Sequence, residues 1–235
     1  MSDTVARVLV TGGGTGIGLA IVKALLARQK AVVAVGRRVE KLADAAALGA
    51  ETVPWDITEN AAGLFARIGP VDGLVHNAGM CKRAGIDQWS EADWSAMWRV
   101  NVMAPALLSQ AFVRQLDGPG SIVAISSTLA ERPAPGTAGY GATKAALVNL
   151  VKHMALELAP RQIRVNAVLP GVVPTEMTQS SADPEHSLPA SVVALHPLGR
   201  LGHGADVADA VCYALDAPWM TGSAVTIDGG LLSRE

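Results

Sequence analysis

The chain has 235 residues, of which 50% are hydrophobic and 17% charged, and this size predicts one domain over residues 1–235 with a single core. The net charge of −2 gives no support to a nucleic-acid partner. No apolar run reaches the roughly 18 residues of a membrane span and no signal peptide opens the chain, so we expect a cytoplasmic protein without membrane contact.

Short runs of β-branched residues alternate with helical patterns along the whole chain. Seven runs predict strands, at residues 6–11, 31–35, 52–55, 71–76, 121–126, 163–169 and 224–227. Helices are expected at residues 17–28, 39–48, 61–68, 90–116, 140–158 and 206–214. Strands that are apolar on both faces and alternate with helices predict an α/β fold. We expect a doubly wound parallel sheet of Rossmann type, with about seven strands and helices on both faces.

One long region carries no helical or strand pattern. It spans residues 178–204 and holds Pro184, Pro189 and Pro197 together with several glycines. Long segments of this kind are often lids or binding segments. We expect a substrate loop here; the alternative is a plain surface excursion.

A glycine-rich stretch joins the first predicted strand to the first predicted helix. It reads TGGGTGIG from Thr11 to Gly18, with the spacing Gly12-x-x-x-Gly16-x-Gly18. Glycines let the backbone approach a ligand closely, and the helix start behind them offers free N–H groups to a pyrophosphate. Between this strand and this helix, the pattern indicates nucleotide binding.

The end of the second predicted strand bears on which nucleotide is bound. An NAD site usually has an acidic residue here, but the chain has Gly36 followed by Arg37 and Arg38. A guanidinium suits a 2′-phosphate, so NADP(H) is favoured and NAD(H) stays possible. Asp56 after the third strand either accepts from the adenine amino group or caps the next helix.

Tyr140 and Lys144 stand four residues apart in a predicted helix, which puts both side chains on one face. A free tyrosine has a pKa near 10 and is a poor acid at neutral pH. A lysine charge within a few ångströms favours the phenolate and lowers that pKa. The pair is therefore a candidate acid/base device.

Taken together, the motifs resemble those of the short-chain dehydrogenase/reductase family, in its short single-domain branch, over essentially the whole chain. The matching positions are Thr11-Gly12-x-x-x-Gly16-x-Gly18, Asp56, Asn77-Ala78-Gly79, Asn101, Ser127, Tyr140-x-x-x-Lys144, Pro170-Gly171 with Thr175, and Asp228-Gly229-Gly230. One such motif is common, whereas all of them in this order are highly specific.

The resemblance implies a catalytic role for four residues. Ser127 lies 13 positions before Tyr140, the usual spacing in the family, and is preferred to Ser126. It would bind the substrate oxygen, while Tyr140 would be the acid/base. Lys144 would hold the ribose and lower the tyrosine pKa, and Asn101 would hold a water that links Lys144 to solvent. As an alternative, Asn101 is an ordinary polar helix residue.

The resemblance also implies a cofactor site. Asn77, Ala78 and Gly79 would line the adenosine side, and Thr175 would contact the nicotinamide carboxamide. The full expected set is Gly12, Gly14, Thr15, Gly16, Ile17, Gly18, Arg37, Arg38, Asp56, Ile57, Asn77, Ala78, Gly79, Tyr140, Lys144, Pro170, Gly171, Val173 and Thr175. Apolar residues that would shape the substrate pocket include Met80, Leu129, Val172 and Met177, but these name no compound.

The activity implied is NADPH-dependent reduction of a ketone or aldehyde, as in carbonyl and xylulose reductases. Alternatives are a 3-oxoacyl-thioester reductase, for which Arg132 and Arg200 could form a docking surface, and an NAD-dependent alcohol dehydrogenase. A non-catalytic dinucleotide-binding regulator is remote, because all four catalytic positions are filled. The family also implies a homo-oligomer, a dimer or tetramer.

Other polar residues give weaker signals. His76 stands where many family members have Asn, and we interpret it as a local substitution beside the cofactor rather than a catalytic base. The histidines show no metal-ligand spacing, and Cys81 and Cys212 lie far apart without a C-x-x-C pair. No metal site is therefore expected.

Overall fold

The computed structural model describes residues 5–178 and 189–234. Its strands form one parallel sheet in the order β3-β2-β1-β4-β5-β6-β7. The strands are β1 (Arg7–Thr11), β2 (Ala31–Gly36), β3 (Glu51–Pro54), β4 (Gly73–His76), β5 (Gly120–Ile125), β6 (Ile163–Pro170) and β7 (Ala224–Ile227). The predicted α/β class, the parallel sheet and the number of strands are confirmed.

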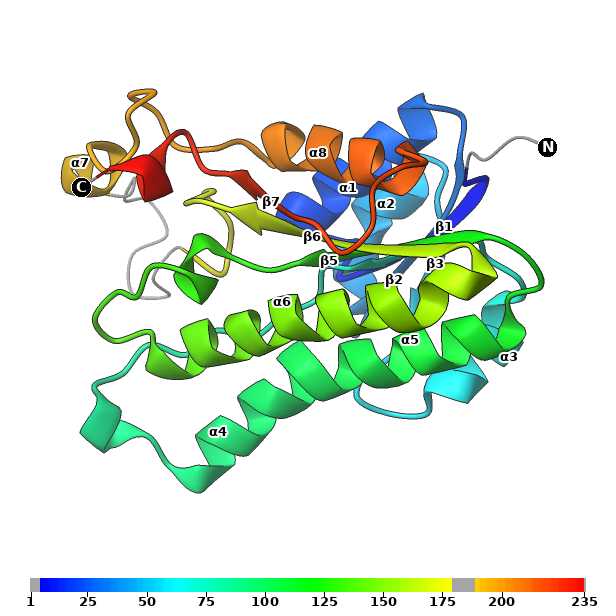
Figure 1. Ribbon diagram of the computed structural model, residues 1–235, viewed down its shortest axis with the longest axis horizontal. Helices are drawn as coiled ribbons and strands as arrows, with labels where there is room; N and C mark the ends of the chain where they lie inside the picture. The colour runs from blue at the N-terminus through cyan, green and yellow to red at the C-terminus, as the bar shows by residue number, and fades with distance from the viewer. Residues whose placement is uncertain (1–4, 179–188, 235) are drawn as a thin grey trace.

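Helices cover both faces of this sheet (Figure 1). One face carries α1 (Gly16–Ala27), α2 (Ala43–Ala47) and α8 (Gly204–Asp216). The other carries α3 (Ala61–Ile68), α4 (Glu91–Trp98), α5 (Ala104–Gln115) and α6 (Ala138–Leu158). This three-layer arrangement follows from strands whose side chains point alternately to opposite faces. Along β1, Val8 and Val10 join the core under α1 and α8, whereas Leu9 joins the core under α5 and α6.

The expected helix over residues 90–116 is interrupted. Ser90 does open it with a capping box, since its hydroxyl accepts from the Asp93 amide at 3.2 Å. After α4, however, a π-helical turn spans Arg99–Met103 before α5 begins. Pro105 has no N–H to donate to the carbonyl of Asn101 four residues earlier, and Ala104 donates instead to Arg99. The wider turn places the buried Asn101 side chain toward β4 and α6.

Two other expected segments differ in detail. The predicted helix at residues 39–48 begins as a 3-10 helix over Val39–Leu42 and continues as α2. The region 178–204 was expected to be irregular, but it contains the short helix α7 (Ala190–Val193). Residues 179–188 of that region lie outside the described part of the chain.

The order of the strands fixes the place of the site. The chain runs outward from β1 through β2 to β3, then returns to pair β4 with β1 and continues through β5 and β6. Doubly wound sheets bind ligands at such a switch point, beyond the carboxyl ends of the strands. The predicted site residues follow β1, β4, β5 and β6 at this edge.

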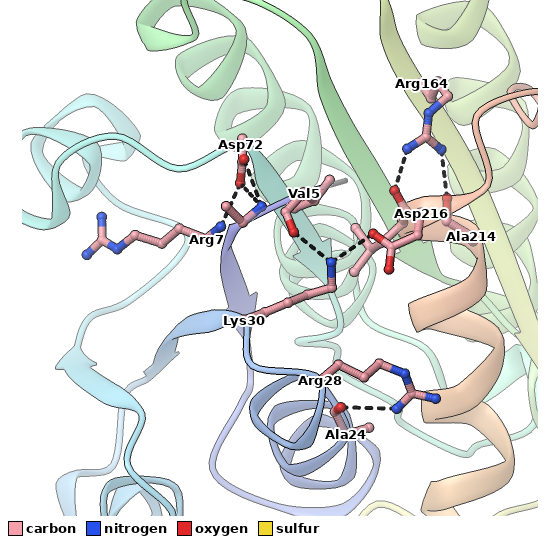
Figure 2. A network of polar contacts seen from close by, with 11 residues as sticks. Val5, Arg7, Ala24, Arg28, Lys30, Asp72, Arg164, Ala214 and Asp216 are labelled. Carbon is pink, nitrogen blue, oxygen red and sulfur yellow. Dashed lines mark hydrogen bonds and ion pairs between the residues drawn. The ribbon is translucent and has the colours of Figure 1, made fainter. Parts of the chain in front are cut away.

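A polar network stabilises the other end of the sheet, where the strands begin (Figure 2). Lys30 precedes β2, and its ammonium donates to the Val5 carbonyl at 2.6 Å and to Asp216 at 2.8 Å. Asp72, just before β4, accepts from the backbone amide of Arg7 at 2.7 Å. These contacts connect the beginning of β1 to the end of α8, so they stabilise the sheet away from the site.

In the described part of the chain, no helix is long and apolar enough to cross a membrane.

Candidate active site

The loop between β1 and α1 is built from glycines that leave no room for side chains. Gly12 and Gly16 have φ angles of 64° and 51°, which L side chains rarely adopt. A Cβ on Gly14 would lie 2.3 Å from the Lys41 carbonyl oxygen, and one on Gly18 would lie 2.0 Å from the Gly12 carbonyl oxygen. The backbone at this loop can therefore approach a ligand closely, as the sequence predicts.

The start of α1 offers free donors to that ligand. Thr15 is the N-cap, but its side chain accepts no capping hydrogen bond, and the first turn holds no acidic residue. The first amides of a helix have no intrahelical partner and carry a partial positive charge. Glycine loop and helix start together fit the pyrophosphate of a dinucleotide.

Asn77 fixes this loop to the end of β4. Its side-chain amide donates to the carbonyls of Thr11 and Gly12, both at 3.1 Å. The Thr11 hydroxyl in turn accepts from the backbone amides of Asn77 and Ala78, at 3.0 and 3.1 Å. That Asn77 and Ala78 line the adenosine side stays a prediction; in the structure their contacts fix the position of the glycine loop.

The corner after β2 and β3 carries the predicted adenosine-ribose residues. Arg37 lies 3.7 Å from Asp56, which also accepts from the amide and hydroxyl of Thr58 at 2.9 and 2.8 Å. Burial acts to raise the pKa of Asp56, but the hydrogen bonds from Thr58 and the charge of Arg37 outweigh it and lower the pKa. Asp56 does not cap α3, because Asn60 does so by accepting from Gly63 at 2.9 Å. The Ile57 side chain is buried in the core.

Arg38, also predicted to meet a 2′-phosphate, pairs with Glu176 at 3.1 Å. Lys41 binds the other oxygen of the same carboxylate at 2.5 Å. The sequence interpretation included neither Lys41 nor Glu176. These two residues lie 135 positions apart in the chain, and no local pattern connects them.

Ser127 and Tyr140 come together beyond the carboxyl end of β5. Ser127 opens the 3-10 helix Thr128–Ala130, where its hydroxyl accepts from the Leu129 amide at 3.1 Å. Tyr140, on the first turns of α6, lies close enough to Ser127 for that side chain to act on the pKa of the phenol. Ser126 points the other way, and its hydroxyl donates to the Lys144 carbonyl at 2.9 Å. Alternation along the strand thus leaves Ser127 as the serine beside the phenol.

The pKa of Tyr140 departs from the sequence expectation. Burial raises it strongly and nearby Cys81 adds to the rise, while the hydrogen bond with Ser127 and the charge of Arg83 act in the opposite direction. Lys144 was expected to lower this pKa. Its ammonium lies 5.6 Å from the centre of the phenol ring. The pKa of the hydroxyl is nevertheless raised, because burial is the largest influence on it. The phenol is therefore protonated at neutral pH.

Lys144 lies one turn further along α6 and is buried. Its ammonium donates to the Ile125 carbonyl at 2.7 Å, at the end of β5. Burial lowers the pKa of Lys144 to about 8. The lysine still carries its charge at neutral pH, although its removal from water disfavours the charged form.

Asn101 is fully buried and holds the segment that follows β4. Its side chain accepts from the Met80 amide and donates to the Met80 carbonyl, both at 2.8 Å, and donates to the Thr143 hydroxyl at 3.0 Å. Gly79 lies between it and Lys144, because a Cβ there would be 3.4 Å from Asn101 Oδ1 and 3.6 Å from Lys144 Nζ. The missing side chain leaves space between the amide and the ammonium.

The segment after β6 crosses toward the glycine loop. Gly171, next to Pro170, donates to the Ile227 carbonyl at 2.9 Å, and Val173 is buried. A Cβ on Gly16 would lie only 2.9 Å from the methyl group of Thr175. The structure thus brings the predicted Thr175 to the mouth of the glycine loop.

Cys81 and Arg83 also lie near the phenol, and sequence analysis missed both roles. Burial raises the pKa of the half-buried Cys81 thiol, while the charge and hydrogen bond of Arg83 lower it. Arg83 is exposed and acts electrostatically on Tyr140 as well. Cys81 and Arg83 stand four and six residues after Asn77, at the rim of the site, and the family's motif residues do not include these positions.

His76 is buried at the end of β4, and its Nε2 lies 2.8 Å from the Ser109 hydroxyl on α5. Burial and then the charge of Lys144 lower its pKa to about 3, so the imidazole is neutral. Its side chain packs inside the sheet–helix layer. Among residues 5–178 and 189–234, no three His, Cys, Asp or Glu side chains are grouped to hold a metal ion.

A separate hollow of about 140 Å³ lies behind the segment after β6, lined in part by Gly171, Val173, His196 and Asp206. None of the hydroxyl or amine groups of Ser127, Tyr140 and Lys144 reaches it. It is therefore not where a carbonyl would meet these groups.

Comparison with known proteins agrees with this arrangement. A family model described as Enoyl-(Acyl carrier protein) reductase matches residues 12–232. The L-xylulose reductase of Bos taurus is 39% identical over 243 residues, which cover 97% of this chain and 96% of the relative. The chain belongs to the short-chain dehydrogenase/reductase family. Members of this family bind a nicotinamide dinucleotide, which the glycine loop and the start of α1 fit.

Two further members of the family are similar over nearly their whole length. Carbonyl reductase [NADPH] 2 of Sus scrofa is 36% identical, with 97% of this chain and 96% of the relative covered. A structure from Beutenbergia cavernae, described as a candidate NAD(P)-dependent gluconate 5-dehydrogenase with bound NADP at low occupancy, superposes with a TM-score of 0.90. That structure is 33% identical, and the match covers 99% of each chain.

Proposed function

We propose that this short-chain dehydrogenase/reductase reduces a ketone or aldehyde to an alcohol, with Tyr140 as the general acid. The observation that carries the proposal is that Ser127 acts on the phenol of Tyr140 while the buried ammonium of Lys144 lies 5.6 Å from the same ring. The names of the relatives, L-xylulose reductase and carbonyl reductase [NADPH] 2, support the same reaction class.

In this mechanism the bound nicotinamide dinucleotide supplies the hydride. Negative charge develops on the carbonyl oxygen, and Tyr140 gives its proton to that oxygen while Ser127 donates a hydrogen bond. Burial favours the protonated phenol, which is the form needed for reduction. Positioned proton transfer contributes about 10²–10⁴-fold in typical enzymes. Lys144 holds positive charge beneath the phenol, and the space at Gly79 between Lys144 and Asn101 suits a water that returns the proton from solvent.

Tyr140→Phe tests the assignment directly. It removes the proton donor and keeps the ring, so we expect turnover to fall by at least about 10²-fold while the dissociation constant for NADP⁺ changes little. Tyr213→Phe is the matched control, since Tyr213 is exposed on α8, and it should retain full turnover. Retention of activity in Tyr140→Phe would overturn the proposed role.

NADP(H) is the proposed cofactor. No carboxylate follows β2 at Gly36, where an NAD site holds the ribose hydroxyls. Three cations, Arg37, Arg38 and Lys41, lie at this corner. Gly36→Asp combined with Arg37→Ile should move the preference toward NADH. A wild-type protein that already prefers NADH would contradict this assignment and favour an NAD-dependent alcohol dehydrogenase.

The substrate can be identified by measuring NADPH consumption with a panel of candidates. The panel comprises ketones, quinones, neutral keto sugars, sugar acids and 3-oxoacyl thioesters. For a carrier-borne thioester, two arginines were candidate docking residues. Arg200 forms two hydrogen bonds with Asp206, at 2.7 and 3.0 Å, and Arg132 donates to the Leu231 carbonyl at 2.8 Å. Both have partners within the fold, so a docking carrier would have to compete with those partners for either arginine.

Arg83 at the rim gives a reason to include the sugar acids. Among the described residues no carboxylate pairs with its guanidinium, and its charge acts on Tyr140. Neighbouring Lys82, by contrast, is paired with Asp93 at 2.5 Å. A substrate carboxylate near the phenol would suit Arg83. Arg83→Gln should then raise the KM for a sugar acid and leave that for a neutral keto sugar unchanged.

We further propose that the protein is a homo-oligomer. Large apolar side chains are exposed along α4, the π-helical turn and α5, namely Trp98, Met103 and Leu107. Exposed apolar side chains grouped on neighbouring helical segments commonly mark an interface between subunits. Light scattering behind size-exclusion chromatography measures the mass directly, and a 24.2-kDa species would refute the proposal.

A further inference from the structure

Glu176 links the segment after β6 to the corner after β2. Its Oε2 lies 3.1 Å from Arg38 and its Oε1 lies 2.5 Å from Lys41. One cation thus occupies each carboxylate oxygen. These are two of the cations proposed above to meet the 2′-phosphate of NADP(H), so a carboxylate of the protein itself lies at the position where that phosphate is expected.

The path of the chain explains how the carboxylate reaches this corner. The Thr178 hydroxyl shares its one proton between the carbonyls of Val173 and Thr175, at 3.1 and 3.0 Å, and accepts from the Thr175 amide at 2.8 Å. This compact turn holds Thr175 against Gly16 at the glycine loop. Glu176 then extends past the loop toward Lys41, whose carbonyl faces Gly14. The turn is held by its own hydrogen bonds, and Glu176 attaches it to the β2 corner.

The attachment is strong enough to form but weak enough to open. The hydrogen bonds from Lys41 and then Arg38 lower the pKa of Glu176, so the carboxylate is ionised at neutral pH. About half of the side chain remains exposed, at 51%, and exposed ion pairs are screened by water and salt. A phosphate carries more negative charge than a carboxylate and offers more acceptor oxygens to a guanidinium. The 2′-hydroxyl of NAD(H) has neither advantage.

We propose that Glu176 is an internal competitor for the 2′-phosphate site. The carboxylate occupies Arg38 and Lys41 in the cofactor-free protein, NADP(H) must displace it, and NAD(H) need not. Glu176 therefore sets how strongly the protein prefers NADP(H), by weakening NADP(H) binding selectively. This proposal rests on the dinucleotide site of the proposed function.

The test uses calorimetric titration of the purified, cofactor-free protein. Glu176→Gln keeps the size of the side chain and removes its charge. We expect the dissociation constants for NADP⁺ and for 2′,5′-ADP to fall by roughly 3- to 10-fold, from the loss of competing exposed ion pairs. The dissociation constants for NAD⁺ and 5′-ADP should change by less than about twofold, since neither ligand carries the 2′-phosphate.

Glu40→Gln is the matched control. Glu40 is exposed in the 3-10 helix that also carries Lys41, so its loss removes the same charge from the same corner without touching the pair. It should change each dissociation constant by less than about twofold. In a Lys41→Gln background, Glu176→Gln should gain less for NADP⁺ than in the wild type, because part of the competition is already gone.

The outcomes separate this proposal from the one on which it rests. Unchanged or weaker NADP⁺ binding in Glu176→Gln, with normal binding to the wild type, overturns the competition alone. Equal weakening of NADP⁺ and NAD⁺ overturns it as well, since Glu176 would then close over either dinucleotide. A wild-type protein that binds neither dinucleotide overturns both proposals.

Discussion

Lys144 gives the sharpest physical test of the site, because its ammonium is buried and can be measured without any substrate. An ordinary lysine has a pKa of 10.5, and burial lowers that of Lys144 to about 8. One pKa unit corresponds to about 1.4 kcal/mol. The difference between these two pKa values corresponds to about 3 kcal/mol. By this amount the folded state disfavours the charged form of Lys144, compared with the unfolded chain.

The direction of the pH dependence follows from proton counting. Below pH 8 both the folded and the unfolded chain carry the proton on Lys144, so this group gives no slope. Between pH 8 and 10.5 the folded chain has lost the proton and the unfolded chain still holds it. The unfolded state then binds more protons, and the free energy of unfolding rises with pH by about 1.4 kcal/mol per unit. The contribution is smallest at neutral pH and largest above 10.5.

Lys144→Met removes this titration and nearly preserves the volume of the side chain. We expect the free energy of unfolding of the wild type minus that of the variant to be level from pH 6.5 to 7.5 and to rise by about 2 to 3 kcal/mol by pH 10. Urea unfolding at each pH gives both values. Lys152→Met, at an exposed position of the same helix, controls for the loss of a lysine from α6. A difference for Lys144→Met that stays level from pH 7 to 10 would refute the argument that burial disfavours its charge.

Two further predictions concern the glycine loop and the other end of the sheet. Gly18→Ala places a Cβ 2.0 Å from the Gly12 carbonyl oxygen. The loop must then shift, and we expect at least a tenfold loss of NADP⁺ affinity in calorimetric titration. Gly49→Ala introduces backbone strain at a φ angle of 97° but meets no neighbouring atom, so it controls for destabilisation alone and should keep that affinity. Lys30→Met removes a buried ammonium that donates to Val5 and Asp216. It should lower the free energy of unfolding by about 2 kcal/mol, and the exposed Lys23→Met on α1 should cost less than about 0.5 kcal/mol; equal losses for the two lysines would contradict the importance of the network.

Features set by local chemistry could be predicted from the sequence. The glycine loop was recognisable because Gly12 and Gly16 adopt positive φ angles and Gly18 contacts backbone, requirements that only glycine meets. Ser127 was chosen over Ser126 because its spacing of 13 positions from Tyr140 is the usual one in the family that the chain resembles, and alternation along a strand lets only one of the two serines face the site. The requirement on the glycines acts within a few residues of chain, so the pattern of residue types records it.

Features that depend on distant parts of the chain could not be predicted. The pairing of Glu176 with Arg38 joins residues 138 positions apart, and exposed charged side chains show no periodicity that would reveal their partner. The π-helical turn at Arg99–Met103 hardly changes the apolar pattern of a long helix, and Pro105 is its one local sign. Arg83 and Cys81 are part of the site because they lie near the phenol of Tyr140, and the sequence does not show that proximity.

The pair of Tyr140 and Lys144 shows both sides of this limit. Helical spacing correctly predicts that the two side chains lie close together, since the ammonium is 5.6 Å from the ring centre. The spacing argument treats them as isolated groups in water, where a cation lowers the pKa of a phenol. Burial in the fold acts on both groups and favours the neutral form of each, so it raises the pKa of Tyr140 and lowers that of Lys144. Proximity is a property of the helix, whereas the direction of the pKa shift is a property of the tertiary packing around it.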